Sequence, residues 1–335
     1  MKKSTIFIII IDVFVFICFF LFYGPIDYVR NTVISTSMIT KTHQYIAHTF
    51  FSNETINSVL QQSSYIPITE DIDLNSIKID TKPKSEYDNK YDEEILTRTP
   101  GNDSYKYIQL TIAGYKAHMV AIYDPSKVKL ATSKKFNYHG MGAEKMINMC
   151  KRLGGVACIN GGGFKDPDGW GSDIPKGYLI KDNQIIWSDT SDKADLIGFN
   201  NDNKLVLTHS TGEEALKQGM RDALEFGPFL IVNGEQIKYG SSAGGYSRAA
   251  RVAIAQRRDG VVLFLVTEGV HTNGPTLKEV AETLAKYGAY NAANLDGGSS
   301  AQLVINNKLV NNPLNVFGQK ITNGREVVSG FILMP

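Results

Sequence analysis

The feature that most constrains this chain is an apolar run near its N-terminus, from about Thr5 to Tyr23. At about 1.5 Å per residue, a helix of roughly 19 residues spans roughly 28 Å, which is close to the thickness of a bilayer core. Two lysines precede the run, and no small-residue cleavage site follows it. We therefore expect residues 1–23 to be an uncleaved single-pass membrane anchor, inserted in the membrane through residues 5–23, with the remainder of the chain outside the cell membrane.

The composition changes twice after this run. Residues 24–64 have apolar positions at helical spacing and are expected to form one or two juxtamembrane helices. Residues 65–104 are rich in acidic residues and lysines and contain few apolar ones, which predicts a charged linker. The folded domain is expected over 105–335.

Short apolar segments separated by turn residues dominate this domain. Two segments flanking Gly114 read as paired strands, and Asp259-Gly260 reads as a second hairpin turn. Helical spacing is found over Met141–Leu153 and Leu277–Tyr287. The pattern predicts an α/β (mixed α+β) fold, in which a strand-rich single catalytic domain with a few helices follows the transmembrane helix.

Charge and cysteine content narrow the class of protein. The net charge is +1, and no basic run is present, so nucleic acid is not an expected partner. Cys18 lies in the apolar run, whereas Cys150 and Cys158 lie eight residues apart in the domain. We expect these two to be buried free thiols, and a disulfide between them is the alternative. Their spacing does not suggest a zinc site.

One pattern occurs twice in the domain. Residues 143–163 and 277–299 each read as a helix, a glycine stop, an apolar strand and a polar residue followed by glycines. The first copy ends in Asn160-Gly161-Gly162-Gly163 and the second in Asp296-Gly297-Gly298-Ser299. We interpret this as a weak internal duplication that brings both loops to one cleft. Exposed backbone N–H groups of such loops suit a phosphate, and the alternative is a pair of tight structural turns.

Candidate catalytic and binding residues lie at predicted strand ends. Asp296 is the first candidate carboxylate, and Glu268 is the second, as in sites that use two carboxylates on a glycosidic bond. Arg251 opens a strand and could bind a phosphate, or it could form a structural salt bridge. His271 is a candidate substrate contact. The residues expected to bind substrate or phosphate are Asn160, Gly161, Gly162, Arg251, Gly297, Gly298, Ser299 and His271.

Several common enzyme motifs are missing from the sequence. It contains no Gly-x-Ser-x-Gly elbow, phosphate-binding P-loop, dinucleotide fingerprint or zinc-protease helix motif. No cofactor is predicted with certainty, and a divalent cation stays open.

Five segments, in this order along the chain, resemble the successive motifs of the phosphodiester glycosidase domain family. They are Val156–Phe164, Phe226–Leu230, Arg251–Ile254, Asp259-Gly260 and Asn294–Ser300. The resemblance covers about 105–335 and implies a mixed domain with a single cleft. It also implies hydrolysis of the bond between a sugar anomeric carbon and a phosphodiester, of the GlcNAc-1-phosphodiester type, in envelope or exported glycans. Many bacterial members of the family are described as exopolysaccharide-related proteins.

The resemblance places Asn160, Arg251, Glu268 and Asp296 at motif positions of the family. A phosphate is already a good leaving group, so the site needs charge complementarity on the phosphate more than a strong general acid. Two other functions stay open: a non-catalytic protein that binds sugar-phosphate polymers or assists exopolysaccharide assembly, and a structural component of a membrane complex. The sugar, the alcohol beyond the phosphate and the stereochemical course also stay open.

Overall fold

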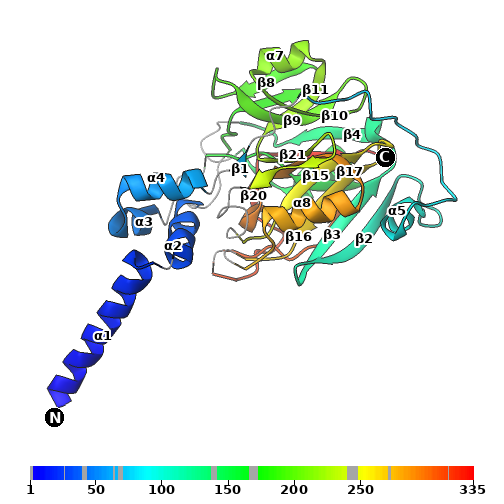
Figure 1. Cartoon of the computed structure of the whole chain (residues 1–335). Coiled ribbons are helices and arrows are strands. Elements are labelled where there is room, and N and C mark those ends of the chain that lie inside the picture. The colour runs from blue at the N-terminus through cyan, green and yellow to red at the C-terminus, as the bar shows by residue number, and fades with distance from the viewer. Residues whose placement is uncertain are drawn as a thin grey trace. The chain divides into compact units, whose positions relative to one another are not determined.

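The computed structural model describes residues 3–25, 27–39, 44–62, 65–66, 71–136, 142–165, 173–239, 248–270, 273–315 and 317–335. The chain forms two compact units (Figure 1). The first comprises Met1–Tyr65 and Tyr239–Ser247, and the second comprises Ile66–Lys238 and Arg248–Pro335.

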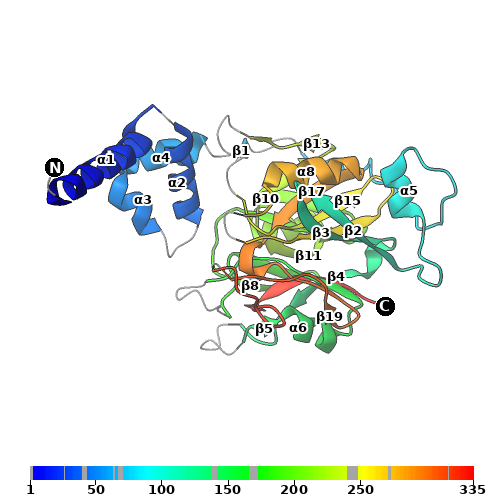
Figure 2. The ribbon, with the colours of Figure 1, turned by 90° about the horizontal axis from the view of Figure 1, so that it is seen from below.

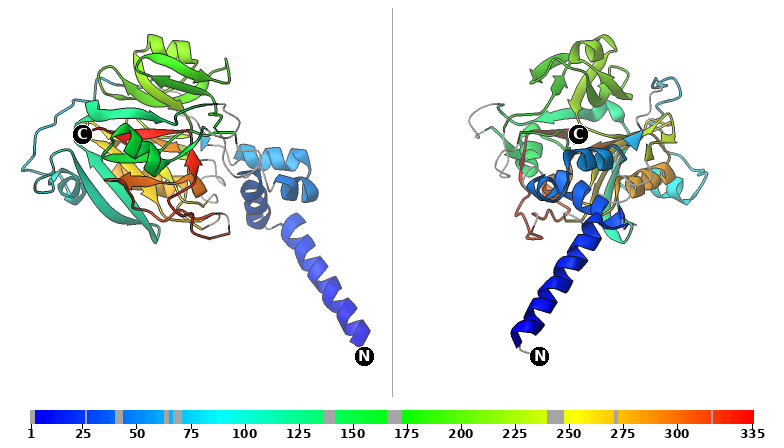
Figure 3. Two further views of the ribbon diagram at one scale, coloured as in Figure 1. Left: turned by 180° about the vertical axis from the view of Figure 1, so that it is seen from behind. Right: turned by 60° about the vertical axis from the view of Figure 1, so that its left-hand side comes forward.

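The first unit is helical, as its sequence predicts (blue in Figure 3). Its helices are α1 (Lys3–Tyr23), α2 (Asp27–Ile39), α3 (Gln44–Phe50) and α4 (Asn53–Gln62). Within α1, Thr5–Tyr23 is long and apolar enough to cross a membrane, and this stretch is not buried in the protein. Helices α2 to α4 are three where one or two were expected, and they enclose a small core of Ile34, Ala47, Phe51, Ile56 and Val59.

The second unit contains three antiparallel sheets. In spatial order, the seven-stranded sheet is β13 (Glu235–Gln236), β12 (Phe229–Val232), β17 (Ala289–Leu295), β15 (Val252–Arg257), β16 (Val262–Thr267), β3 (Tyr115–Ile122) and β2 (Tyr105–Ile112). One five-stranded sheet is β10 (Leu205–Ser210), β9 (Ala194–Asn200), β11 (Met220–Glu225), β7 (Tyr178–Lys181) and β8 (Gln184–Ser188). The other five-stranded sheet is β19 (Lys308–Leu309), β18 (Leu303–Ile305), β6 (Ala157–Asn160), β21 (Ser329–Leu333) and β4 (Val128–Thr132).

Two pairs of short strands complete the list. These are β20 (Glu326–Val327) with β5 (Glu144–Lys145), and β1 (Tyr65–Ile66) with β14 (Lys238–Tyr239). The remaining helices of the described chain are α5 (Lys90–Leu96), α6 (Met146–Leu153), α7 (Gly212–Lys217), α8 (Leu277–Lys286) and the 3₁₀ turns η1 (Pro125–Lys127) and η2 (Gly298–Ser300).

All three large sheets share one apolar core. Each contributes alternate strand residues to it, for example Ile254 from the first sheet, Phe199 from the second and Phe331 from the third. The opposite face of each sheet is covered by helices: α8 and α5 cover the first sheet, α7 the second and α6 the third. Figure 2 shows α8 and α6 on opposite outer sides of this unit. A mixed fold, as predicted, is therefore confirmed.

Local sequence explains the two helices of the repeated pattern. Helix α6 ends at Gly154, whose left-handed backbone (φ 74°) favours glycine. Helix α8 begins at Thr276, which forms a reciprocal capping box with Glu279. Each helix then leads into a strand, β6 or β17, as the sequence predicts. The structure thus contains helix, turn and strand twice, and the two strands belong to different sheets.

The segment 71–104, which the sequence suggests is a charged linker, belongs to the second unit and packs against its other elements, and we call it the strap. Its backbone hydrogen-bonds to the β15–β16 turn: Lys78 N donates to Arg258 O (2.7 Å) and Asp80 N to Asp259 O (2.9 Å). Its Ile77 is 1% exposed. The compact unit therefore begins at Ile66 rather than near residue 105.

The acidic residues of the strap explain why the prediction was wrong. Asp92 accepts a hydrogen bond from the buried Arg257 guanidinium at 2.8 Å, and Glu94 accepts one from the Tyr287 hydroxyl at 2.6 Å. Burial of a guanidinium requires a counter-charge. Some charges of the strap are therefore partners for groups of the domain rather than solvated linker charges.

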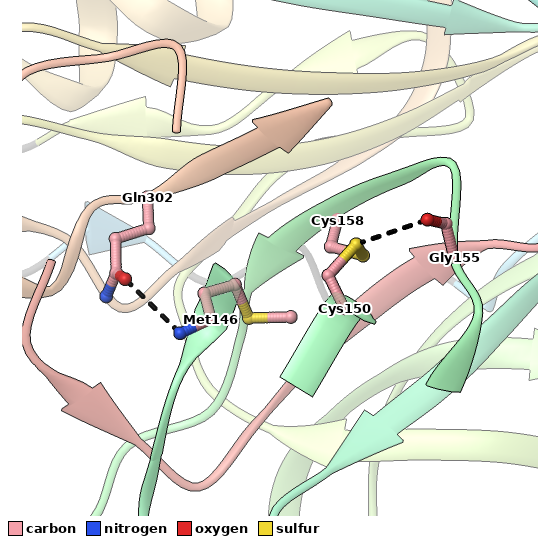
Figure 4. Close-up of a disulfide and its surroundings, with 5 residues drawn as sticks. All are labelled: Met146, Cys150, Gly155, Cys158 and Gln302. Atoms are coloured by element: carbon pink, nitrogen blue, oxygen red, sulfur yellow. Dashed lines mark hydrogen bonds between the residues drawn. A yellow bond between two sulfur atoms is a disulfide. The ribbon is translucent and has the colours of Figure 1, made fainter. Parts of the chain in front are cut away.

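Cys150 and Cys158 form a disulfide, so the expectation of two free thiols is wrong (Figure 4). The Gly154-Gly155 turn folds the start of β6 back beside the end of α6, which brings the two Cα atoms to 6.0 Å. That distance is within the usual range for a disulfide. The bond joins α6 to the strand that ends at Asn160.

Candidate active site

Three adjacent strands bring the main candidate residues to one edge of the seven-stranded sheet. Val252 of β15 pairs with Leu295 of β17 on one side and with Val266 of β16 on the other. Arg251 immediately precedes Val252. Because neighbouring strands are antiparallel, Asp296, Arg251 and Glu268 all lie at this edge, on strands that span roughly 10 Å.

Side-chain and backbone bonds fix this edge. Arg251 N donates to Thr267 Oγ1, and Thr267 N donates to Arg251 O, both at 2.8 Å. Arg251 Nε also donates to Pro275 O at 3.3 Å. The Arg251 main chain is therefore held by Thr267 and its guanidinium is held by the Pro275 carbonyl, while the residue as a whole is half-buried.

The two glycine loops lie together, as the repeated pattern predicts. The side chain of Asn160 is 1% exposed and joins them: its Nδ2 donates to Asp296 O at 2.6 Å, and its Oδ1 accepts from Gln302 N at 2.9 Å. In addition, Asp296 N donates to Gly161 O at 2.8 Å. We call these three hydrogen bonds the loop clamp. Both polar atoms of the Asn160 amide are used within the protein.

The amides of several loop glycines have partners inside the protein. Gly161 N donates to Ser329 O (2.9 Å), Gly162 N to Ser329 Oγ (3.1 Å) and Gly298 N to Ala250 O (2.8 Å). The sequence suggested that these groups face a phosphate. In the structure they hold the loops against neighbouring backbone, so a ligand would have to displace existing bonds to use them.

Close packing explains why glycine is required in both loops. A Cβ at Gly161 would lie 2.3 Å from Leu224 Cδ2, and one at Gly297 would lie 2.5 Å from Ala250 O. Both distances are shorter than atoms can approach. The tight-turn explanation that the sequence left open therefore accounts for these two glycines.

Glu268 has specific hydrogen-bond donors. Its Oε1 lies 3.1 Å from His118 Nε2, and Asn312 N donates to Oε1 at 2.9 Å and to Oε2 at 3.2 Å. The Glu268 side chain is 21% exposed. Asp296 and Ser299 are also partly exposed at the same edge, whereas His271 lies outside the described residues.

A further carboxylate near the first glycine loop is not apparent from the sequence. Glu225 ends β11, and its backbone O would lie 3.2 Å from a Cβ at Gly162. Its Oε2 is buried without a hydrogen-bond partner among the described residues. Burial raises the pKa of this carboxyl, and Asp189 and Asp195 raise it further against the opposing effect of Lys176.

A separate cavity of about 680 Å³ lies away from this edge. It is lined by the strap and by residues such as Arg257 and Ala289, which are at the other ends of β15 and β17. At about 3.3 Å per residue, these ends are roughly 20 Å from Arg251 and Asp296. Among the described residues, no group of three or more His, Cys, Asp or Glu side chains is placed to hold a metal ion.

The loop clamp should make a measurable contribution to stability. Substituting Asn160→Ala leaves a buried carbonyl and a buried N–H without their partner, so we expect the free energy of unfolding to fall by about 2–4 kcal/mol. Chemical denaturation of the full chain in detergent measures this. The exposed Asn201→Ala is the matched control and should change stability by less than about 0.5 kcal/mol. Equal stability of Asn160→Ala and the wild type would contradict the clamp.

Glu225 should make stability depend on pH. Its pKa is raised in the folded state, so its stabilising contribution is present at low pH and is lost as pH rises through the folded pKa. The Glu225→Gln variant does not titrate, so its melting temperature relative to the wild type should increase from pH 4 to pH 7. The exposed Glu235→Gln is the control and should show a constant difference. If the difference in melting temperature between Glu225→Gln and the wild type were the same at pH 4 and pH 7, the raised pKa of Glu225 would be refuted.

Comparisons with known proteins identify a family that matches this chain. The family model described as phosphodiester glycosidase matches residues 153–334, which include both glycine loops. A human N-acetylglucosamine-1-phosphodiester alpha-N-acetylglucosaminidase is 31% identical over 154 residues, covering 41% of this chain and 30% of that protein. An uncharacterized SPbeta prophage-derived protein of Bacillus subtilis, YomE, is 25% identical over 269 residues, covering 78% of this chain and 38% of that protein.

A solved structure has a similar fold. The catalytic domain of zebrafish N-acetylglucosamine-1-phosphodiester alpha-N-acetylglucosaminidase, auto-inhibited by its pro-peptide, superimposes with a TM-score of 0.57 at 19% identity. The match covers 69% of this chain and 82% of that one. The curated relatives are much longer, since the chain spans 38% and 30% of their lengths. With more than half of its residues matched by the family model, the chain belongs to the phosphodiester glycosidase family.

Proposed function

We propose that this protein hydrolyses the glycosidic bond between a sugar, of the N-acetylglucosamine type, and a phosphodiester. Family membership supports the class of reaction. The human relative, whose name states action on an N-acetylglucosamine-1-phosphodiester, supports the class of substrate. Envelope or exported glycans that carry such a bond are the proposed substrates.

The observation that carries the proposal is the shared sheet edge. Two carboxylates, Asp296 and Glu268, flank the cation Arg251 on three adjacent strands. A glycosyl phosphodiester has an electrophilic carbon next to an anion, so a site for its hydrolysis needs carboxylate and cation together. The edge where β17 and β16 end and β15 begins brings the two carboxylates and the guanidinium together.

Each residue has a proposed role. The Asp296 carboxylate acts on water or on the anomeric carbon, with Glu268 as its partner carboxylate. The Arg251 guanidinium binds the phosphate, whose departure it assists by neutralising negative charge. Ser299 contacts the substrate. Asn160 acts through the loop clamp, since its amide is already bonded to the Asp296 and Gln302 backbones.

The proposed location is outside the cell membrane, with α1 as an uncleaved anchor. The length and apolar composition of Thr5–Tyr23 support a membrane span. The Cys150–Cys158 disulfide supports an oxidising compartment for the second unit.

Hydrolysis is tested directly with the full chain in detergent and a panel of glycosyl-1-phosphodiesters, including the methyl diester of GlcNAc-α-1-phosphate. Free GlcNAc is expected as a product, measured by chromatography. The Asp296→Asn variant should lose about 100- to 10,000-fold in turnover because the neutral amide cannot act as a base or nucleophile. The backbone bonds of the loop clamp do not involve the substituted side chain.

The exposed Asp202→Asn is the matched control and should retain full turnover. Full turnover by Asp296→Asn would reject the catalytic assignment. Binding of a sugar-phosphate polymer on a glycan array, without turnover of any diester, would favour the non-catalytic alternative.

The membrane topology is tested with epitope tags at Met1 and after Pro335 in intact cells. Added protease should remove the C-terminal tag and leave the N-terminal tag protected, because two lysines precede the apolar run. A mature protein that begins after the run would show a cleaved signal peptide instead. Protection of both tags would place the domain inside the cell.

A further inference from the structure

Behind Glu268 lies a line of three hydrogen-bonded side chains, Gln109, Tyr107 and His118, which we call the histidine support. Gln109 Nε2 donates to the Tyr107 hydroxyl at 3.0 Å, and that hydroxyl lies 2.7 Å from His118 Nδ1. The other ring nitrogen of His118 faces Glu268 Oε1 at 3.1 Å. The line therefore runs from β2 through β3 to the residue that follows β16.

The strand register produces this line. Tyr107 and Gln109 are two residues apart on β2 and so point to the same face, and Gln109 is paired directly with His118 on β3. His118 is paired with Val266, two residues before Glu268. The Glu268 backbone is held as well, because its N–H donates to Lys116 O at 2.7 Å. The histidine support and the Glu268 backbone are thus held in place by three adjacent strands, β2, β3 and β16, of the same sheet.

The chemistry of the partners assigns the direction of two of these hydrogen bonds. An amide nitrogen such as Gln109 Nε2 can only donate, so the Tyr107 oxygen accepts from it, and the same hydroxyl is also hydrogen-bonded to His118 Nδ1. A carboxylate can only accept, so His118 donates to Glu268 through Nε2–H. This pattern places a proton on His118 Nε2.

The two carboxylate oxygens of Glu268 therefore differ in their hydrogen bonds. Oε1 is bonded to both His118 Nε2 and Asn312 N, whereas among the described residues Oε2 has only the longer 3.2 Å contact with Asn312 N. The His118 side chain is 6% exposed, and that of Glu268 is 21% exposed. Solvent therefore reaches the carboxylate and hardly reaches the imidazole, and Oε2 is the oxygen with more capacity for a further bond.

We propose that His118, held in place by Tyr107 and Gln109, is a positioning residue that fixes the Glu268 carboxylate with Oε2 available to the reaction. This rests on the proposed role of Glu268 in hydrolysis. A group that acts on a bound substrate must be held in its reactive orientation before the substrate arrives, and a buried donor on one oxygen restricts rotation of the carboxylate. The remaining support residues act through His118.

Kinetics of matched variants test the proposal. His118→Ala should lower kcat about 10- to 100-fold, the effect of losing a hydrogen bond to a charged group, with KM unchanged within about twofold. His118→Gln should recover most of this loss, because its amide N–H can replace Nε2–H. Tyr107→Phe keeps the ring and removes the hydroxyl, and it should lower kcat about 3- to 10-fold. The exposed His209→Ala, 64% exposed in its side chain, should have wild-type kinetics.

A merely structural role predicts a different result. In that case His118→Gln would be no better than His118→Ala, or KM and kcat would change together with thermal stability. Either outcome would overturn the proposal. Recovery by His118→Gln at unchanged KM supports it.

A spectroscopic measurement separates the failure of this inference from that of the proposed function. The chain has six histidines, so selective ¹⁵N labelling of histidine resolves the His118 ring. We expect the His118 ring to be protonated at Nε2, and Glu268→Gln should shift its Nε2 resonance while the resonances of His209 stay unchanged. If no diester is hydrolysed but this coupling is present, the hydrolase proposal fails and the support stands. If hydrolysis occurs and the coupling is absent, the positioning role is rejected.

Discussion

The structure of the candidate site depends on one side-chain amide. Asn160 is buried where two different sheets meet, and its two polar atoms bond the backbones that follow β17 and precede β18. Buried polar groups are stable only when they are hydrogen-bonded, so this amide is satisfied only when both loops are in place. The position of the Asp296 backbone relative to β6 follows from that requirement.

The arrangement of the sheets places the chemistry at an edge. Antiparallel neighbours alternate in direction, so the end of one strand, the start of the next and the end of a third lie side by side. The interior behind this edge is filled by the shared apolar core, which includes Val252, Val266 and Leu295. The polar residues that follow or precede these positions are thereby held at the boundary between core and solvent.

Much of this arrangement could be predicted from local sequence. Alternating apolar residues around Gly114 and the helical spacing over 277–287 identify their elements because local geometry determines those patterns. The convergence of the glycine loops was predicted from their repetition. The partners of the Gly161 and Gly162 amides were not, because Ser329 is distant in sequence and only tertiary packing brings it there. The strap was missed for the same reason, since the charge on Asp92 has a buried partner in Arg257.

At Asp296, the hydrogen bonds of the loop clamp involve the backbone, whereas the proposed catalytic role belongs to the side chain. The clamp uses the carbonyl and N–H of this residue, which every amino acid except proline provides, and leaves the carboxylate out of those bonds. Natural variants that exchange this side chain would keep the backbone groups that form the loop clamp. Relatives that have lost hydrolysis but still recognise glycans would be expected to arise readily from such a framework, with a change of one residue rather than a new fold.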